Sequence, residues 1–206
     1  MSTPPSSTLR QVRAAFDMDT LRVYQAFSNE IADAALRAQT FVGPFKRSRM
    51  TWIKPSFCWM MYRSGWATKQ GQERILGIDI ARDGFEWALA QSCTTAFDPT
   101  IHPDADAWSS LLRSSPVRIQ WDPERALSLQ PLPIRTIQIG LSGRAVDAYV
   151  DTWIRRIDDL TALSKQIEAL VGRGETEHAR QLLPNEQPYP LSENLAHRIG
   201  CLATRA

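Results

Sequence analysis

The stretch RMTWIKPSFCWMMYRSGW, residues 49–66, joins a strand pattern to a helix pattern without a gap. Its first part, MTWIK, contains a β-branched pair and an indole, which favour a short strand. Pro55 and Ser56 follow, and proline suits the first turn of a helix while serine caps one. The stretch therefore predicts a strand followed directly by a helix, and hence a fold that mixes the two.

The same stretch carries the main candidate site. Alternation along the strand puts Trp52 and Lys54 on one face. The helix that begins after Lys54 presents unpaired backbone N–H groups and the positive end of its dipole, which together favour an anion. We expect a phosphate pocket of Lys54, Ser56 and Arg63 with an aromatic wall of Trp52 and Trp59. The alternative is that the tryptophans are core residues and the cations point to solvent.

Arg13 and Tyr24 are further candidates from the N-terminal part of the chain. They belong to the segment LRQVRAAFDMDTLRVYQAF, residues 9–27. If residues 9–14 form a strand beside residues 21–27, an arginine reaches the same pocket, where its forked guanidinium grips phosphate better than lysine does. Surface arginines that flank a strand are the alternative.

Gln120 and Glu124 are candidates from the segment VRIQWDPER, residues 117–125. Here a strand pattern ends in a loop, which is where functional residues often lie. A carboxylate that faces an anion pocket can stabilise a cationic sugar transition state or accept a proton. Glu124 is therefore the candidate catalytic residue, and the alternative is an ordinary Asp-Pro turn with Glu124 paired to a surface arginine.

Strand and helix patterns alternate along the rest of the chain. Strands are expected over residues 21–27, 73–80, 117–121 and 135–141, and helices after Ser28, from Asp83, around 107–112 and around 175–183. Between Gly143 and Gly172, apolar residues recur at helical spacing for about eight turns. We therefore predict an α+β fold: one domain with a mixed or split β core, flanking helices and one long C-terminal amphipathic helix.

The boundaries of this domain follow from composition. Residues 1–8 are rich in proline, serine and threonine and are expected to form a disordered tail. The domain is expected to cover residues 9–183. Residues 184–206 carry several prolines and are expected to form a C-terminal extension.

Composition excludes several classes of function. The formal net charge of the 206 residues is only +2, so any affinity for a polyanion must come from a local patch. The three cysteines are scattered and follow no metal-ligand spacing, so we expect neither a disulfide framework nor a metal site. No segment approaches the roughly 20 apolar residues of a membrane span. These features indicate a cytoplasmic protein without membrane contact.

The runs VYQAF, RMTWIKPSFCWMMYRSGW, QERILGIDIARDGFEWAL and PLPIRTIQIGL resemble the microbial family known as domain of unknown function 4291. The resemblance covers roughly residues 10–163 and rests most on the TWIKPSF block. It implies an intact member of that family and supplies no chemistry.

A looser resemblance concerns the order of elements. A cation-bearing strand, a strand followed by Pro-Ser and a helix, and a late strand that ends near a glutamate are similar to the layout of ADP-ribosyltransferases, which bind NAD in a split β core. The resemblance implies NAD as the cofactor, an arginine such as Arg13 on a phosphate, and Glu124 as the catalytic acid. The Ser-Thr-Ser triplet of those enzymes is missing, so the likeness is one of topology.

The sequence suggests two classes of function, and a third class remains if neither applies. The first is a nucleotide- or NAD-handling transferase. The alternative is a non-catalytic protein that binds RNA or single-stranded DNA by stacking bases on the same tryptophans. The third is a partner-binding protein whose tryptophans are all core.

Overall fold

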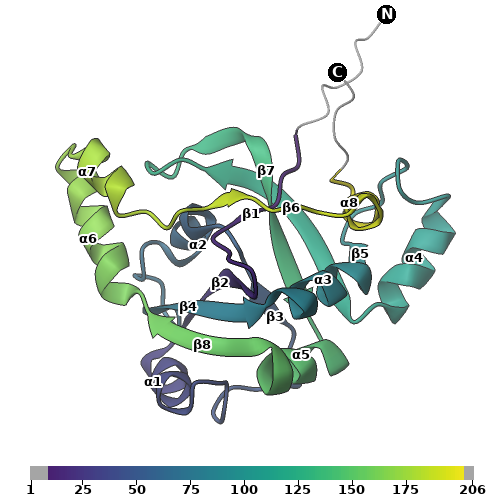
Figure 1. The fold of residues 1–206 in the computed structure, drawn as a ribbon, viewed down its shortest axis with the longest axis horizontal. Helices are drawn as coiled ribbons and strands as arrows, with labels where there is room; N and C mark the ends of the chain where they lie inside the picture. The colour runs from purple at the N-terminus through teal and green to yellow at the C-terminus, as the bar shows by residue number, and fades with distance from the viewer. Residues whose placement is uncertain (1–8, 202–206) are drawn as a thin grey trace, which may run out of the picture.

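Two β-sheets, flanked by helices, form the framework of the molecule (Figure 1). The computed structural model describes residues 9–201. The strands are β1 (Arg13–Ala14), β2 (Thr20–Phe27), β3 (Thr51–Ile53), β4 (Arg74–Ala81), β5 (Ser92–Thr94), β6 (Val117–Arg125), β7 (Pro131–Leu141), β8 (Ile154–Asp159) and β9 (Gln187–Pro188). The helices are α1 (Asn29–Ala38), α2 (Phe57–Ser64), α3 (Arg82–Ala90), α4 (Ala105–Ser114), α5 (Arg144–Ala148), the π-helix η1 (Tyr149–Trp153), α6 (Thr161–Gly172), α7 (Thr176–Gln181) and α8 (Glu193–Ile199).

The first sheet has the strand order β3-β7-β6-β5, and the second has the order β2-β4-β8. In the first sheet β5 runs parallel to β6 and the other neighbours are antiparallel; in the second all neighbours are antiparallel. The two sheets touch at one backbone bridge, where Tyr24 of β2 and Lys54 exchange N–H···O bonds of 2.7 and 3.3 Å. The bridge fixes the end of β3 against the middle of β2.

Successive residues of β2 face two different cores, because neighbouring side chains of a strand point to opposite faces. Val23 belongs to the larger cluster, which includes Ile78 of the second sheet and Ile139 of the first. Tyr24 belongs to a smaller cluster with Phe57 of α2 and residues of α6. Lys54 therefore follows β3 at the border between the two cores.

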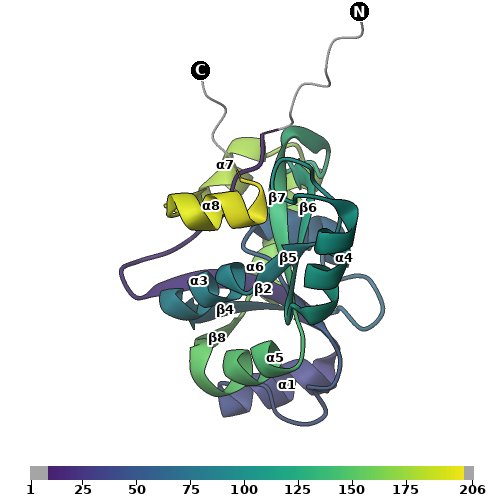
Figure 2. The same ribbon diagram turned by 90° about the vertical axis from the view of Figure 1, so that its right-hand side faces the viewer.

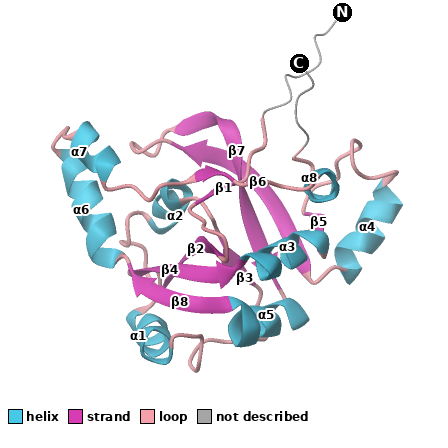
Figure 3. Ribbon diagram, viewed as in Figure 1, coloured by secondary structure: helices cyan, strands magenta, loops and turns pink. Residues whose placement is uncertain are grey.

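The predicted α+β class is confirmed, and most predicted elements are present (Figure 3). The strand and helix read from residues 49–66 are β3 and α2. The Ser56 hydroxyl oxygen accepts a hydrogen bond from the Trp59 N–H at 3.1 Å, so Ser56 caps α2 as the sequence predicted. The expected tail, residues 1–8, lies outside the described residues.

The prediction of one long helix between Gly143 and Gly172 is wrong. The segment forms α5 and η1, turns into β8, and becomes helical again only at α6. The apolar spacing that suggested one helix is also compatible with a strand in the middle of the segment. Ile157 of β8, for example, is buried and pairs with Ile78 of β4. The second edge of β4 needs hydrogen-bond partners, and β8 supplies them. Within residues 9–201 no helix is both long and apolar enough to cross a membrane.

Both ends of the described chain pack on the domain. Residues 13–14 pair with residues 187–188. The hypothesis that residues 9–14 form a strand beside residues 21–27 is therefore wrong. From the expected extension, α8 packs against α3 and β5 (Figure 2). Its residue Ile199 is buried in the larger core.

Gly84 of α3 gives a stability prediction. A Cβ atom at this position would lie 2.4 Å from Cγ of the Trp153 ring, which is fixed in the core. Gly84→Ala is therefore expected to destabilise the protein by about 1 to 3 kcal/mol in chemical denaturation. Gly172→Ala is the matched control, because no atom lies within 4 Å of its added Cβ. Equal stability of the two variants would contradict the packing described here.

Candidate functional site

A cavity of about 650 Å³ lies between β2, β3, α2 and the β6–β7 hairpin. Apolar residues such as Phe27, Phe45 and Met60 form part of its wall. The polar and aromatic residues that line it come from several parts of the chain and include Gln25, Lys46, Arg49, Thr51, Trp52, Lys54, Arg63, Gln72, Gln120 and Gln138. Its volume is in the range of ordinary small-molecule sites.

Lys54 is the buried cation of this cavity. Its side chain is only 6% exposed, and Nζ donates one hydrogen bond, to the Trp52 carbonyl oxygen at 3.1 Å. No carboxylate among residues 9–201 forms an ion pair with it. Burial and, to a smaller extent, the Arg63 charge lower the pKa of the Lys54 amine, the Asp122 charge opposes the shift, and the net pKa is about 7. A large fraction of this amine is therefore neutral near pH 7.

The other cations of the cavity stand at its rim. Lys46 and Arg49, on the loop before β3, and Arg63 of α2 are exposed. Within the described part of the chain none of these three side chains is bonded to an acidic side chain. Unpaired cations around one opening attract an anion and can donate several charge-assisted hydrogen bonds to it.

Two glutamines form the far wall and share one acid. Gln120 of β6 and Gln138 of β7 are a cross-strand pair. The amide of Gln120 donates to Asp122 Oδ1 at 3.0 Å, and the amide of Gln138 donates to Asp122 Oδ2. Donation to one carboxylate orients both amides. It leaves their carbonyl oxygens without a donor among the described residues, so these oxygens can accept hydrogen bonds from a ligand.

Trp52 supplies the aromatic surface of the cavity. It pairs with Gly140 of β7, and a Cβ atom at Gly140 would approach the indole ring to 3.0 Å. The absence of a side chain at Gly140 thus lets the ring lie close against the strand. Trp52 is half-buried, so part of its ring is accessible to a ligand.

The N-terminus of α2, where the sequence predicted a phosphate, binds the protein's own carboxylates. Glu186, just before β9, accepts a hydrogen bond from the Phe57 N–H at 2.7 Å. The Ser56 hydroxyl donates to Glu124 Oε1 at 2.9 Å and accepts from the Trp59 N–H. Because these groups already bind each other, the helix end offers no open anion site, and a ligand anion must bind nearer Lys54 and Arg63.

Glu124 lies away from the cavity wall because β6 is irregular there. The register between β6 and β7 shifts between Pro123 and Arg125, and such a bulge re-aims the side chain it contains. Glu124 is buried, and its Oε1 also accepts from the Arg125 N–H at 2.7 Å. Of the acids that the sequence places on β6, Asp122 is the one joined to cavity residues.

Glu186 is a half-buried acid beside the start of α2. Desolvation raises the pKa of its carboxyl group, the Phe57 N–H opposes the rise, the Glu124 charge adds to it, and the net pKa is about 8. Tyr24 is completely buried next to it, and its hydroxyl has no hydrogen-bond partner among the described residues. Burial first, and then the Glu186 charge, raise the pKa of the Tyr24 hydroxyl well above its usual value.

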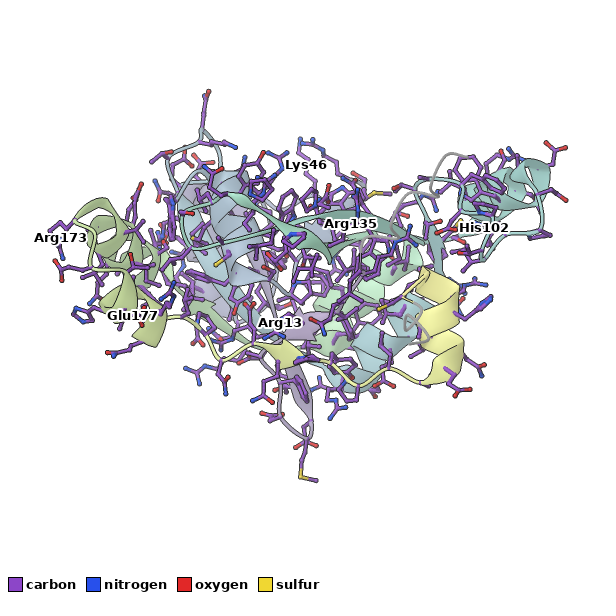
Figure 4. The ribbon with its side chains drawn as sticks, turned by 90° about the horizontal axis from the view of Figure 1, so that it is seen from above. Arg13, Lys46, His102, Arg135, Arg173 and Glu177 are labelled. Atoms are coloured by element: carbon purple, nitrogen blue, oxygen red, sulfur yellow. The ribbon has the colours of Figure 1, made fainter. Side chains whose placement is uncertain are left out.

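Arg13 and Trp59 also lie outside the cavity wall. Arg13 Nη2 donates to the Glu186 carbonyl oxygen at 2.6 Å. In Figure 4 Arg13 and Lys46 lie on opposite sides of Arg135 of β7. Trp59 is buried, with its ring 5.1 Å from that of Tyr62. Trp59 is therefore a core residue, as the alternative interpretation had it, and forms no wall for a ligand.

The structure thus divides the predicted site residues into two groups. The cavity brings together Trp52, Lys54, Arg63 and Gln120. Arg13, Tyr24, Ser56, Trp59 and Glu124 lie in or near the buried cluster around the start of α2. The sequence analysis named Gln120 but missed Gln138, its partner across the strands, and Glu186. Glu186 had only one signal, a single acid within the proline-rich PNEQPYP segment.

The described residues bring together no group of three or more His, Cys, Asp or Glu side chains suited to a metal ion.

Comparison with known proteins gives one family. A family model described as domain of unknown function (DUF4291) matches residues 11–189, which is most of the chain. No curated protein matches the sequence.

Proposed function

This chain belongs to the DUF4291 family, and we propose that it binds a nucleotide in the cavity beside β3 and acts as a nucleotide- or NAD-handling transferase. The observation that carries the proposal is the composition of one cavity wall. It combines unpaired cations, two oriented amides and an accessible indole.

The cations suit the phosphates of such a ligand. Arg63 and Arg49 carry planar guanidinium groups that bind phosphate oxygens in pairs, and Lys46 adds a third positive charge at the rim. Since these side chains have no carboxylate partner in residues 9–201, a phosphate does not have to break an ion pair to bind. Lys54 lies deeper, so a phosphate between the rim and Lys54 meets N–H donors on both sides.

The amides and the indole suit the base. The carbonyl oxygens of Gln120 and Gln138 can accept hydrogen bonds from the amino group of a base. Trp52 offers a ring face, and stacking of a base on an aromatic side chain is worth about 1 to 3 kcal/mol. NAD and the common nucleoside triphosphates all carry a base, a ribose and a diphosphate bond, and the cavity has a complementary group for each charged or aromatic part.

A transfer reaction needs a group that accepts a proton, and two acids are candidates. Glu124 is the acid that the sequence predicts. Asp122 is the acid that the geometry favours. It accepts hydrogen bonds from two cavity residues, and its charge raises the pKa of the Lys54 amine. In this proposal Asp122 orients Gln120 and Gln138 toward the ligand and is the acceptor for a proton in the transfer.

Nucleotide binding tests the proposal directly. Tryptophan fluorescence and calorimetry with NAD, ATP, GTP, CTP and UTP are expected to show saturable binding of at least one of them. Arg63→Ala is expected to weaken it about tenfold or more, because a charge-assisted hydrogen bond is lost. Arg173→Ala is the control: this exposed arginine pairs with Glu175 and lies far from Lys46 in Figure 4. Absence of saturable binding across the whole panel would refute the proposal.

Single-stranded nucleic acid is the alternative that the sequence left open. A strand binder presents several stacking residues in a row, whereas Trp59 and Trp66 are buried and Trp52 is the one tryptophan of residues 9–201 that lines the cavity. A gel shift at two salt concentrations separates the two functions. An oligonucleotide complex that weakens steeply with salt, together with no mononucleotide binding, would favour the alternative.

A further inference from the structure

The surroundings of the Lys54 amine differ from those of an ordinary structural lysine. Buried lysines usually have a carboxylate partner, because an unpaired buried charge is costly. Lys54 Nζ has only the Trp52 carbonyl oxygen, and the group borders a cavity. That single bond, together with the backbone bridge between Lys54 and Tyr24, holds the amine at a fixed place in the wall.

We propose that Lys54 Nζ is a nucleophile that attacks the α-phosphorus of the bound nucleotide and forms a covalent nucleotidyl-lysine. The inference rests on the proposed function, since it requires a nucleotide in this cavity. The nitrogen lone pair forms a P–N bond, and the bond from the α-phosphorus to the bridging oxygen breaks with its electron pair. Pyrophosphate leaves from a nucleoside triphosphate, and nicotinamide mononucleotide leaves from NAD. The proton lost by the amine passes to water.

The charges around Lys54 support this chemistry. A lysine can attack only when its amine is neutral, and burial favours the neutral form. Two charged groups act on Lys54 from the packed elements: Arg63 of α2 lowers its pKa and Asp122 of β6 raises it, with a net pKa of about 7. Arg63 thus has two effects, since it draws the phosphate and also keeps the amine uncharged. The rim cations then stabilise the charge that develops on the leaving phosphate.

The ligand class follows from the reaction. A nucleoside monophosphate has no leaving group on its α-phosphate, so it can bind but cannot react. Nucleoside triphosphates and dinucleotides joined by a diphosphate can do both. The second step would pass the nucleotidyl group from Lys54 to an acceptor, which makes the protein a transferase with a covalent intermediate.

The test uses the full chain with ATP, GTP or NAD labelled on the α- or adenylate phosphate, in buffer with magnesium chloride. Intact-mass measurement is expected to show a gain of one nucleoside monophosphate, and peptide mapping is expected to place it on Lys54. The bond should break in mild acid and survive mild alkali, as a phosphoramidate does. Adduct formation should rise as the pH increases through about 7, because the amine becomes neutral there.

Lys54→Arg and Lys165→Arg are the matched variants. Lys54→Arg removes the primary amine and is expected to form no adduct, and calorimetry measures its nucleotide binding separately. Lys165, which pairs with Glu168 on α6, lies outside the cavity lining, so Lys165→Arg should form the adduct normally. Because mapping on the wild-type chain is decisive by itself, poor folding of Lys54→Arg would not block the test.

The outcomes separate this inference from the proposed function. Nucleotide binding without any adduct at pH 8, or an adduct on another residue, would overturn the nucleophile role and leave the binding proposal intact. An absence of nucleotide binding would overturn both. An adduct on Lys54 that releases pyrophosphate or nicotinamide mononucleotide in equal amount supports both.

Discussion

Replacement of Glu186 by glutamine is expected to stabilise the protein strongly above pH 8 and to leave its stability nearly unchanged near pH 4. Glu186 is half-buried, and desolvation of its carboxyl group, followed by the Glu124 charge, raises its pKa from 4.5 to about 8. The charged form is therefore poorly accommodated in the folded state. Glutamine keeps an oxygen that can accept the Phe57 N–H, and it carries no charge at any pH.

The direction of the pH effect follows from proton linkage. Below pH 4.5 the carboxyl group is protonated in both the folded and the unfolded chain, so Glu186 has no electrostatic cost. Between pH 4.5 and about 8 the unfolded chain loses the proton while the folded chain keeps it, so stability falls as pH rises. Above about pH 8 the full cost is present, and a pKa rise of this size corresponds to several kcal/mol.

Chemical denaturation of wild type and Glu186→Gln at pH 4 and pH 9 measures the effect. The variant is expected to be more stable than wild type at pH 9 by several kcal/mol and to differ by less than about 1 kcal/mol at pH 4. Lys54 is present in both proteins, so its own titration largely cancels in the difference. Glu193→Gln, at an exposed position of α8, should change stability by less than about 1 kcal/mol at either pH. A Glu186→Gln protein without any gain at pH 9 would show that Glu186 is not held as a buried acid.

The strand and helix of residues 49–66 could be predicted because their signals are local. The Pro55-Ser56 step and the cap at Trp59 involve residues within one turn of each other. The switch from η1 to β8 could not be predicted in this way. No glycine or proline marks it, and β8 forms because the edge of β4, far away in the sequence, needs a partner.

Half of the candidate site could be predicted for the same reason. Trp52, Lys54 and Arg63 lie within one strand–helix unit, so their neighbourhood can be read from spacing. Gln138 and Asp122 join them only through the pairing of β6 with β7. Ser56 was grouped with Lys54 because it is two residues away, but its hydroxyl bonds to Glu124 in the buried cluster.

The roles of the two acids on β6 give the second large prediction. Asp122→Asn is expected to lower the turnover of bound nucleotide by about a hundredfold or more, because it removes a proton acceptor and disturbs two oriented amides. Glu124→Gln is expected to change turnover by less than about threefold, because its carboxylate bonds to Ser56 and to the Arg125 N–H, and neither of these residues lines the cavity. Turnover is followed as release of pyrophosphate or nicotinamide mononucleotide, with calorimetry to measure nucleotide binding separately.

A pH profile shows whether Asp122 acts on Lys54 as well. The Asp122 charge raises the pKa of the Lys54 amine, so its removal should shift the midpoint of adduct formation to a pH below that of wild type. Glu124→Gln should leave the midpoint in place. The opposite result is that Glu124→Gln keeps binding but abolishes turnover, while Asp122→Asn leaves turnover unchanged. Glu124 would then be the catalytic acid that the sequence predicts. The cavity must then open toward the start of α2 when nucleotide binds, because only that movement would bring the Glu124 carboxylate to the ligand.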